Sequence, residues 1–323
     1  MGQNTKSTFP QGKACSERRN IMTTMNETIR SGGILPVVAI DKIEYAVPLA
    51  KAIVEAGLPG MEVTFRTACA KEAIQAIRAA YPNLLLGAGT ILSCAIADEA
   101  IDAGADFLVT PGFNPKVVAY AIEKNIPIYP GVTTPAEIEE AMEMGLEVLK
   151  FFPAEMSGGI AKLKILAGPY KNIKFIPTGG IDEKNFKDYL ALDNVVAVGG
   201  SFMIAKKAMA AGDFDAVKAE LDRVIDVMLG LKLTHVGLNF SCEEEALGVA
   251  GELQNAFHMP YNVGNSSIFS GVKEFELMKK GGRGTHGHIS IGVTDIDRGI
   301  RFLKHRGVEV IPESLVVKNG KFS

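Results

Sequence analysis

A lysine inside an apolar segment is the residue of this sequence with the clearest potential for chemistry. Lys150 lies in "EVLKFFPAE", residues 147–155, a stretch apolar enough to predict a buried strand. Burial disfavours the ammonium form of a lysine, and the neutral amine is a nucleophile that attacks carbonyl groups and forms Schiff bases. The alternative is structural: Lys150 points outward, or extends its ammonium group to the strand end.

Three further polar residues lie within or just after other short apolar runs. Glu62 has the side chain of a general acid or base, and Arg66 offers the two-point geometry that binds a carboxylate. Thr90 adds a hydroxyl donor in "GAGT". The competing interpretations are a surface ion pair between Glu62 and Arg66, and a helix cap formed by Thr90.

Two glycine pairs stand at the ends of later apolar runs. They are "PTGG", residues 177–180, and "GGS", residues 199–201. Backbone N–H groups at such turns, together with a helix N-terminus, commonly bind phosphate in barrel proteins. Ordinary strand-to-helix turns also use glycine, so this pattern alone leaves both readings open.

The apolar runs themselves form a repeat that would bring these residues together. Eight runs recur at intervals of roughly 20 to 27 residues, with amphipathic stretches between them: 34–40, 60–65, 84–89, 106–110, 126–130, 147–152, 174–180 and 195–200. This pattern predicts an α/β protein with a (β/α)8 TIM barrel, whose chemistry lies at the C-terminal strand ends. The alternative is an open doubly wound sheet, but its G-x-G-x-x-G marker is absent after the first run.

Composition excludes several classes of protein. The 323 residues are 47% apolar with a net charge of −3, so no basic excess exists to bind nucleic acid or an anionic membrane. Four scattered cysteines without a C-x-x-C pair indicate a reducing cytoplasm rather than a disulfide framework. No apolar run reaches membrane-spanning length. Residues 1–24 lack the apolar core of a signal peptide and are predicted to be a disordered leader.

The pattern of the sequence changes at Gly230, and all five histidines lie beyond this residue. The strands and helices expected there are "KLTHVGLNF", "CEEEALGVAGELQNAF", a hairpin of "SSIFSG" and "VKEFELMKK", then "THGHISIGV" and "DIDRGIRFLKHRG". We therefore predict a barrel over residues 25–229 and a second, smaller α+β domain of βαβββ type over residues 230–323.

Six motifs of the barrel together resemble one enzyme family. "EVTFRT", "GAGT", "TPGF", "LKFFPAE", "PTGGI" and "VGGS" are similar to the class I 2-keto-3-deoxy-6-phosphogluconate (KDPG) aldolases, some of which act on 4-hydroxy-2-oxoglutarate (KHG). The resemblance covers about residues 26–212. It implies that Lys150 forms the Schiff base with a keto acid, that Glu62 is the general acid/base, and that Arg66 and Thr90 bind the pyruvate carboxylate.

The same resemblance extends to the rest of the site. Pro111, Phe152 and Thr178 would line the pocket, and the phosphate would bind at four residues: Gly179, Gly180, Gly200 and Ser201. It implies a cytoplasmic homotrimer of the Entner–Doudoroff pathway that cleaves a phosphorylated keto acid without a metal. Ala39 replaces a longer or polar residue found in many relatives, which leaves the preferred substrate open.

The C-terminal segment resembles a second superfamily through "THVGLNF", "FELM" and "GHISIGV". These motifs are similar to the vicinal oxygen chelate, or glyoxalase-like, proteins. The resemblance implies a divalent metal bound by His235, Glu276 and His288, with His286 as a rival to His288. Because the sequence ends at Ser323 before a closing strand, we expect the module to be incomplete, its metal site weak or empty, and its role packing or regulation.

Two other functions fit parts of the pattern. A phosphate-binding barrel isomerase or epimerase would use Lys150 only for its charge. A keto-acid-binding regulatory protein would use the same residues to bind its ligand without turnover.

Overall fold

The computed structural model describes residues 13–314, 317–318 and 321–322. The chain divides into two compact units, one comprising residues up to Ile225 together with Ile300–Val310, the other Asp226–Gly299 and residues from Ile311 onward. Each unit has its own sheet and its own cluster of buried apolar residues. Among the described residues, no helix combines the length and apolar character that crossing a bilayer requires.

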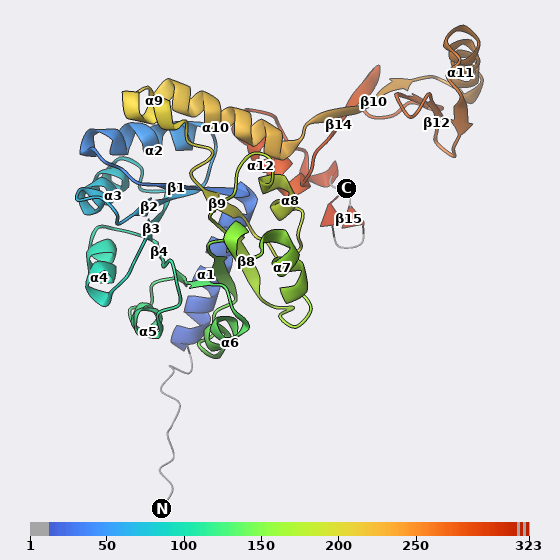
Figure 1. Cartoon of the computed structure of the whole chain (residues 1–323). Helices are drawn as coiled ribbons and strands as arrows, with labels where there is room; N and C mark the ends of the chain where they lie inside the picture. The colour runs from blue at the N-terminus through green and yellow to red at the C-terminus, as the bar shows by residue number, and fades with distance from the viewer. Residues whose placement is uncertain (1–12, 315–316, 319–320, 323) are drawn as a thin grey trace, which may run out of the picture. The chain divides into compact units, whose positions relative to one another are not determined.

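The first unit is a curled parallel sheet with helices around it, a TIM-like barrel as predicted (Figure 1). Its strands are β1 (Ile34–Val38), β2 (Gly60–Thr64), β3 (Leu85–Gly89), β4 (Phe107–Val109), β5 (Ile128–Tyr129), β6 (Gly131–Val132), β7 (Val148–Phe151), β8 (Lys174–Pro177) and β9 (Val198–Gly200). Hydrogen bonds connect them in the orders β5-β4-β3-β2-β1-β9 and β6-β7-β8. Single bridges from Phe175 to Val195 and from Thr178 to Gly199 join β8 to β9.

The fifth predicted strand, 126–130, corresponds to β5, and an unpredicted short strand, β6, follows it after Pro130. Proline has no N–H to donate to a ladder, so regular pairing stops there. Its carbonyl still accepts a hydrogen bond of 2.9 Å from the backbone N–H of Lys150. The barrel wall therefore continues past the break and fixes the backbone of β7.

The helices that cover the barrel are α2 (Ala46–Glu55), α3 (Ala70–Ala80), α4 (Cys94–Asp102), α5 (Pro115–Glu123), α6 (Pro135–Glu143), α7 (Gly159–Leu166), α8 (Phe186–Leu190), α9 (Lys206–Ala211) and α10 (Phe214–Leu229). Short 3-10 turns, η1 (Ile43–Tyr45) and η2 (Glu155–Ser157), follow β1 and β7. Local sequence sets several ends. Thr134 and Glu137 form a capping box at α6. Gly57 and Gly104 have φ of 85° and 96° just after α2 and α4, where a left-handed residue ends a helix.

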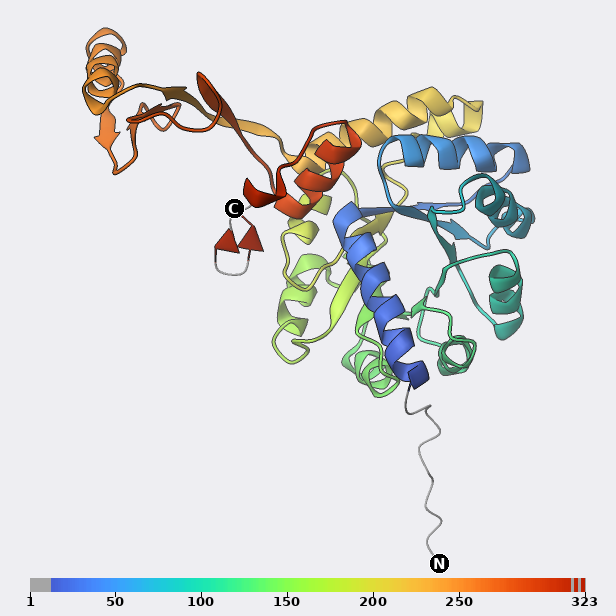
Figure 2. The ribbon, with the colours of Figure 1, turned by 180° about the vertical axis from the view of Figure 1, so that it is seen from behind.

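The leader prediction needs correction, because helix α1 (Lys13–Gly32) occupies half of the segment expected to be disordered. Residues 1–12 lie outside the described part of the chain. Met25 and Ile29 are buried in a cluster with barrel residues such as Phe107 and Ile176, and Met22 packs against the same cluster. Figure 2 shows α1 running across the end of the barrel. Apolar residues at positions 22, 25 and 29 recur every three to four residues, so they lie on one face of the helix. This face holds the otherwise polar segment against the barrel.

The second unit is built on a sheet of order β11-β12-β13-β10-β14. Its elements are β10 (Lys232–Asn239), α11 (Glu243–Phe257), β11 (Tyr261–Val263), β12 (Ser267–Ser270), β13 (Phe275–Met278), β14 (Gly287–Gly292), α12 (Ile296–His305), η3 (Pro312–Ser314), β15 (Val317–Lys318) and β16 (Lys321–Phe322). Strand β10 pairs parallel with β13 and antiparallel with β14. Ala246, Ala250, Ile268 and Leu277 form its small core. The short strand β11 was absent from the sequence-based expectation.

The C-terminal half of α12 belongs to the barrel unit. Arg301 donates a hydrogen bond of 3.2 Å from Nη2 to the carbonyl of Gly57, and Nε2 of His305 lies 2.9 Å from the carbonyl of Glu55. These carbonyls belong to the last residue of α2 and to the second residue after it, where backbone acceptors lack intrahelical partners. Side chains 244 and 250 residues away in sequence thus complete the end of a barrel helix.

Candidate active site

A lysine and a glutamate meet inside the barrel. Nζ of Lys150 on β7 lies 3.4 Å from Oε1 of Glu62 on β2. Only 5% of Lys150 and 2% of Glu62 is exposed to solvent. The sequence analysis placed both residues at the active end of the barrel, and the structure brings them into contact. The alternatives of an extended surface lysine and of an ion pair between Glu62 and Arg66 are wrong.

Glycine at position 89 makes room for this pair. A Cβ atom on Gly89 would lie 2.0 Å from Oε1 of Glu62 and 2.7 Å from its Cδ, closer than atoms can approach. Gly199 gives similar clearance to Thr178, since a Cβ there would lie 2.4 Å from Oγ1. Both glycines are therefore required by neighbouring side chains rather than by turns.

Arg66 and Thr90 also contact each other, as the predicted carboxylate site requires. Nε of Arg66 donates a hydrogen bond of 3.0 Å to Oγ1 of Thr90. Thr90 has a φ of 61°, an uncommon conformation for a threonine. It does not cap the next helix, because the cap of α4 is Ser93, whose Oγ accepts from the N–H of Ile96. The Nη groups of Arg66 face the cavity described next, where a ligand can reach them.

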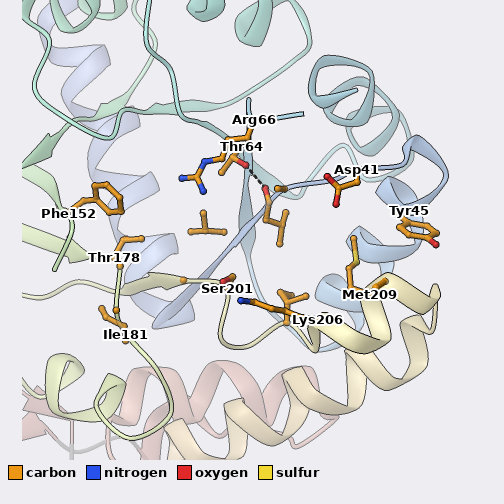
Figure 3. Close-up of a pocket in the computed structure, with 18 of the residues that line it drawn as sticks. Asp41, Tyr45, Thr64, Arg66, Phe152, Thr178, Ile181, Ser201, Lys206 and Met209 are labelled. Carbon is orange, nitrogen blue, oxygen red and sulfur yellow. Dashed lines mark hydrogen bonds between the residues drawn. The ribbon is translucent and has the colours of Figure 1, made fainter. Parts of the chain in front are cut away.

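A cavity of about 620 Å³ opens beside these residues. Figure 3 shows side chains from several strands facing it. Its lining includes seven of the residues predicted for substrate binding: Arg66, Phe152, Thr178, Gly179, Gly180, Gly200 and Ser201. Lys150, Glu62 and Thr90 are not part of this lining. Nζ of Lys150 lies 5.4 Å from the centre of the ring of Phe152, which is part of it. Pro111 is not part of the lining; its carbonyl instead approaches the backbone of Gly131.

Sequence reasoning missed five residues that line the same cavity: Asp41, Lys42, Tyr45, Lys206 and Met209. They stand on the segments after β1 and β9, beyond the strand ends on which the prediction was based. A hydrogen bond from Lys42 to the Tyr45 hydroxyl, 3.2 Å long, raises the pKa of Lys42. The signal available was the pair of charged residues directly after the first apolar run.

The second unit contains a separate cluster of potential metal ligands. Nε2 of His235 lies 3.0 Å from Nε2 of His288, and the two nitrogens lie 3.2 and 3.3 Å from Oε2 of Glu276. Oε1 of Glu276 accepts a hydrogen bond of 2.7 Å from Ser267. His286, the predicted rival of His288, is exposed and is not part of the cluster. Strands β10, β13 and β14 each contribute one of the three residues.

A parallel barrel with a buried lysine beside a carboxylate has the arrangement of a Schiff-base lyase, an enzyme that breaks carbon–carbon bonds next to a carbonyl. Comparison with known proteins agrees. The family model described as KDPG and KHG aldolase matches residues 25–220. The chain belongs to this aldolase family.

Individual relatives resemble the barrel closely. The chain is 46% identical over 207 residues to 2-dehydro-3-deoxy-phosphogluconate aldolase of Treponema pallidum, an alignment that covers 64% of this chain and 99% of the relative. It is 42% identical to KHG/KDPG aldolase of Escherichia coli K12 over 199 residues, 62% of this chain and 93% of the relative.

Solved structures show the same similarity. KDPG aldolase of Legionella pneumophila, with pyruvate captured as a covalent carbinolamine, is 35% identical with a TM-score of 0.60; the match covers 62% of this chain and 97% of that one. The Zymomonas mobilis ZM4 enzyme with 3-phosphoglycerate is also 35% identical, with a TM-score of 0.58, over 64% of this chain and 95% of that one.

Proposed function

We propose that this protein is a class I aldolase that cleaves KDPG to pyruvate and glyceraldehyde 3-phosphate. The observation that carries the proposal is the buried contact of 3.4 Å between Lys150 and Glu62 at the active end of the barrel. The names of the relatives support the substrate, and the carbinolamine in the Legionella enzyme supports covalent chemistry. Cleavage of KHG to pyruvate and glyoxylate is a second reaction of the same site, supported by the name of the Escherichia coli relative.

Lys150 begins the reaction. Its amine adds to the ketone carbon C2 of the substrate, and the carbinolamine loses water to give an iminium ion. The bond between C3 and C4 then breaks, because its electron pair flows into the iminium and forms an enamine. The C4 hydroxyl must lose its proton in this step so that the aldehyde is released. Protonation of the enamine at C3 and addition of water regenerate the amine and free pyruvate.

Glu62 is the group that moves these protons. Its Oε1 lies within reach of Nζ, so it can serve carbinolamine formation, the C4 hydroxyl and C3 in turn. Its burial among apolar residues shields the carboxylate from solvent. Gly89 holds it in position by leaving space for its oxygen.

Arg66 and Thr90 would bind the pyruvate carboxylate, since a guanidinium group and a hydroxyl suit two carboxylate oxygens. Phe152 and Thr178 would line the reacting carbons. The backbone at Gly179, Gly180, Gly200 and Ser201 would receive the phosphate. We further infer a cytoplasmic homotrimer; a mass measurement in solution tests the trimer directly.

Two assays test the proposal against its alternatives. Pyruvate release from KDPG, coupled to lactate dehydrogenase, should be seen with the wild-type protein and lost in Lys150→Ala. Borohydride reduction with pyruvate should attach a pyruvyl group to Lys150 and to no other lysine. An isomerase or epimerase would form no adduct, and a keto-acid-binding regulatory protein would release no pyruvate. Either result would overturn the proposal.

The second unit has the geometry for a second function, a divalent metal site of the glyoxalase-like kind. Two ligand atoms that each lie about 2.1 Å from a metal are about 3.0 Å apart when the ligand–metal–ligand angle is a right angle. In a tetrahedral site they are about 3.4 Å apart. The three distances between His235, Glu276 and His288 fall within this interval. Two imidazoles and a carboxylate suit zinc, iron, nickel or manganese, and Ser267 orients the carboxylate.

Metal analysis of the untagged protein tests this site. The sequence alone led us to expect a weak or empty site, but the close grouping of the three ligand atoms favours an occupied one. We expect bound transition metal in the wild type, its loss in His288→Ala, and its retention in the matched control His286→Ala. A wild-type protein free of metal after incubation with zinc and with nickel would contradict the site. Equal metal content in both variants would assign the metal to other ligands.

A further inference from the structure

The strand ends of β8 and β9 form one side of the active-site cavity and present unused hydrogen-bond donors. Gly180 has a φ of 78°, and within the described part of the chain neither its N–H nor that of Ser201 has a hydrogen-bond partner. The helices that follow, α8 and α9, contain only five and six residues. Helices this short align few peptide dipoles, so the anion site predicted from a helix N-terminus lacks its main source of positive charge.

Lys206 supplies a positive charge at this place. It is the first residue of α9 and lines the cavity, and in Figure 3 its side chain points toward Ser201, across the cavity from Arg66. No ion pair of Lys206 is found among the residues that the structure describes. A cation without a carboxylate partner beside free N–H groups is typical of a phosphate site.

The loop between Ser201 and Lys206 is held in place by buried side chains, so the position of Lys206 beside Ser201 is fixed by the fold. Met203 is fully buried and Ile204 is 6% exposed. The N–H of Ile204 donates to the carbonyl of Ser201 over 3.1 Å. Two buried side chains in so short a connection fix where its ends lie, and therefore hold Lys206 close to Ser201.

Charge elsewhere in the cavity supports one orientation of the substrate. Among the described residues that line the cavity, the only carboxylate is Asp41, which lies beside Tyr45 in Figure 3. A phosphate dianion is repelled from that side and attracted to Lys206. The substrate carboxylate would then remain with Arg66 and Thr90.

We propose that Lys206 is a specificity-determining residue that selects keto acids ending in a phosphate group. The inference rests on the proposed aldolase function and adds a residue that the family motifs do not contain. A residue that binds the phosphate does not touch the bond that breaks, so its binding is equal in the ground state and the transition state. Such binding affects KM and leaves kcat nearly unchanged.

The test compares KDPG with the same keto acid lacking its phosphate. Lys206→Ala should raise KM for KDPG by about 10- to 100-fold, the effect of one charged hydrogen bond, and change kcat/KM for the unphosphorylated acid by less than about threefold. Lys206→Arg should recover most of the loss. Lys207→Ala is the matched control, because Lys207 is the next residue in the sequence, is exposed and does not line the cavity. Inorganic phosphate should inhibit the wild type and Lys207→Ala competitively, and Lys206→Ala at least about tenfold more weakly.

An unchanged KM for KDPG in Lys206→Ala, or unchanged inhibition by inorganic phosphate, would refute the role of Lys206 while leaving the aldolase intact. A fall in kcat/KM of the same size for both keto acids would also refute it, because the effect would not depend on phosphate. Failure of the aldolase proposal looks different: the wild-type protein itself would release no pyruvate and form no borohydride adduct.

Discussion

Replacing Gly89 with alanine tests how closely the acid/base group must be held. The new Cβ would lie 2.0 Å from Oε1 of Glu62, whereas ordinary contact begins at 3.4 Å. The carboxylate must therefore retreat by the difference, about 1.4 Å. Oε1 is already 3.4 Å from Nζ of Lys150, at the outer limit of a hydrogen bond. A displacement of this size breaks the contact on which proton transfer depends.

We expect kcat of Gly89→Ala to fall by about 10²- to 10³-fold. A misplacement of about 1 Å costs roughly 10²-fold, and complete loss of a general acid/base costs about 10²- to 10⁴-fold. The fold should survive, since overpacking costs about 1–3 kcal/mol and loss of glycine freedom returns about 0.5–1 kcal/mol. The measurement is kcat in the coupled pyruvate assay, with thermal unfolding measured in parallel.

Two comparisons make the result specific. Gly112→Ala is the matched control, because a Cβ at Gly112 meets nothing within 4 Å. Its kcat should stay within about twofold of wild type. In a Glu62→Gln background, Gly89→Ala should lower kcat by less than about threefold further, since both changes remove the same group. A folded Gly89→Ala protein with near-normal kcat, or a double variant whose losses multiply, would refute the reasoning.

Three further predictions follow from the same structure. Lys150→Arg should be as inactive in pyruvate release as Lys150→Ala, because a guanidinium group is not deprotonated near neutral pH; measurable turnover by the arginine variant would contradict a Schiff base. KDPG cleavage should persist in EDTA, because the iminium ion accepts the electron pair; activity lost in EDTA and restored by added metal would indicate a metal-dependent aldolase instead. Ile29→Ala should lower the free energy of unfolding by about 2–5 kcal/mol, because Ile29 is only 2% exposed in the cluster that α1 forms with the barrel; denaturant unfolding showing a change below about 1 kcal/mol would mean that α1 does not contribute to stability.

The barrel was predictable because its strands are easily recognised in the sequence. Parallel strands buried on both faces appear as short apolar runs, and glycines such as Gly57 and Gly104 mark the helix ends between them. The contact of Lys150 with Glu62 followed from topology, since strand ends converge on one side of a barrel. The contact of Arg66 with Thr90 followed from the same convergence of strand ends.

The sequence analysis missed elements and residues whose structure depends on contacts with other parts of the chain. Helix α1 has few apolar residues, and only the docking of Met25 and Ile29 on the barrel explains why it is ordered. Strand β11 is exposed along its whole length and exists through pairing with β12. Lys206 is the first residue of the short helix α9 rather than part of a strand, so the analysis of strand ends did not include it. The role of Pro111 in the pocket stays a prediction, since Pro111 is not among the described residues that line the cavity.

The assignment of residues 300–310 to the barrel unit has a consequence for synthesis on the ribosome. The chain emerges from its N-terminus, so all the barrel strands are available before β10 is made. The carbonyls of Glu55 and Gly57 must nevertheless wait 250 and 244 residues for His305 and Arg301 to reach them. In the order of translation, the second unit is therefore an insertion within the barrel unit rather than an addition after it. A nascent chain halted near Ile225 would expose this part of its surface, and full protection would arrive only when α12 leaves the exit tunnel.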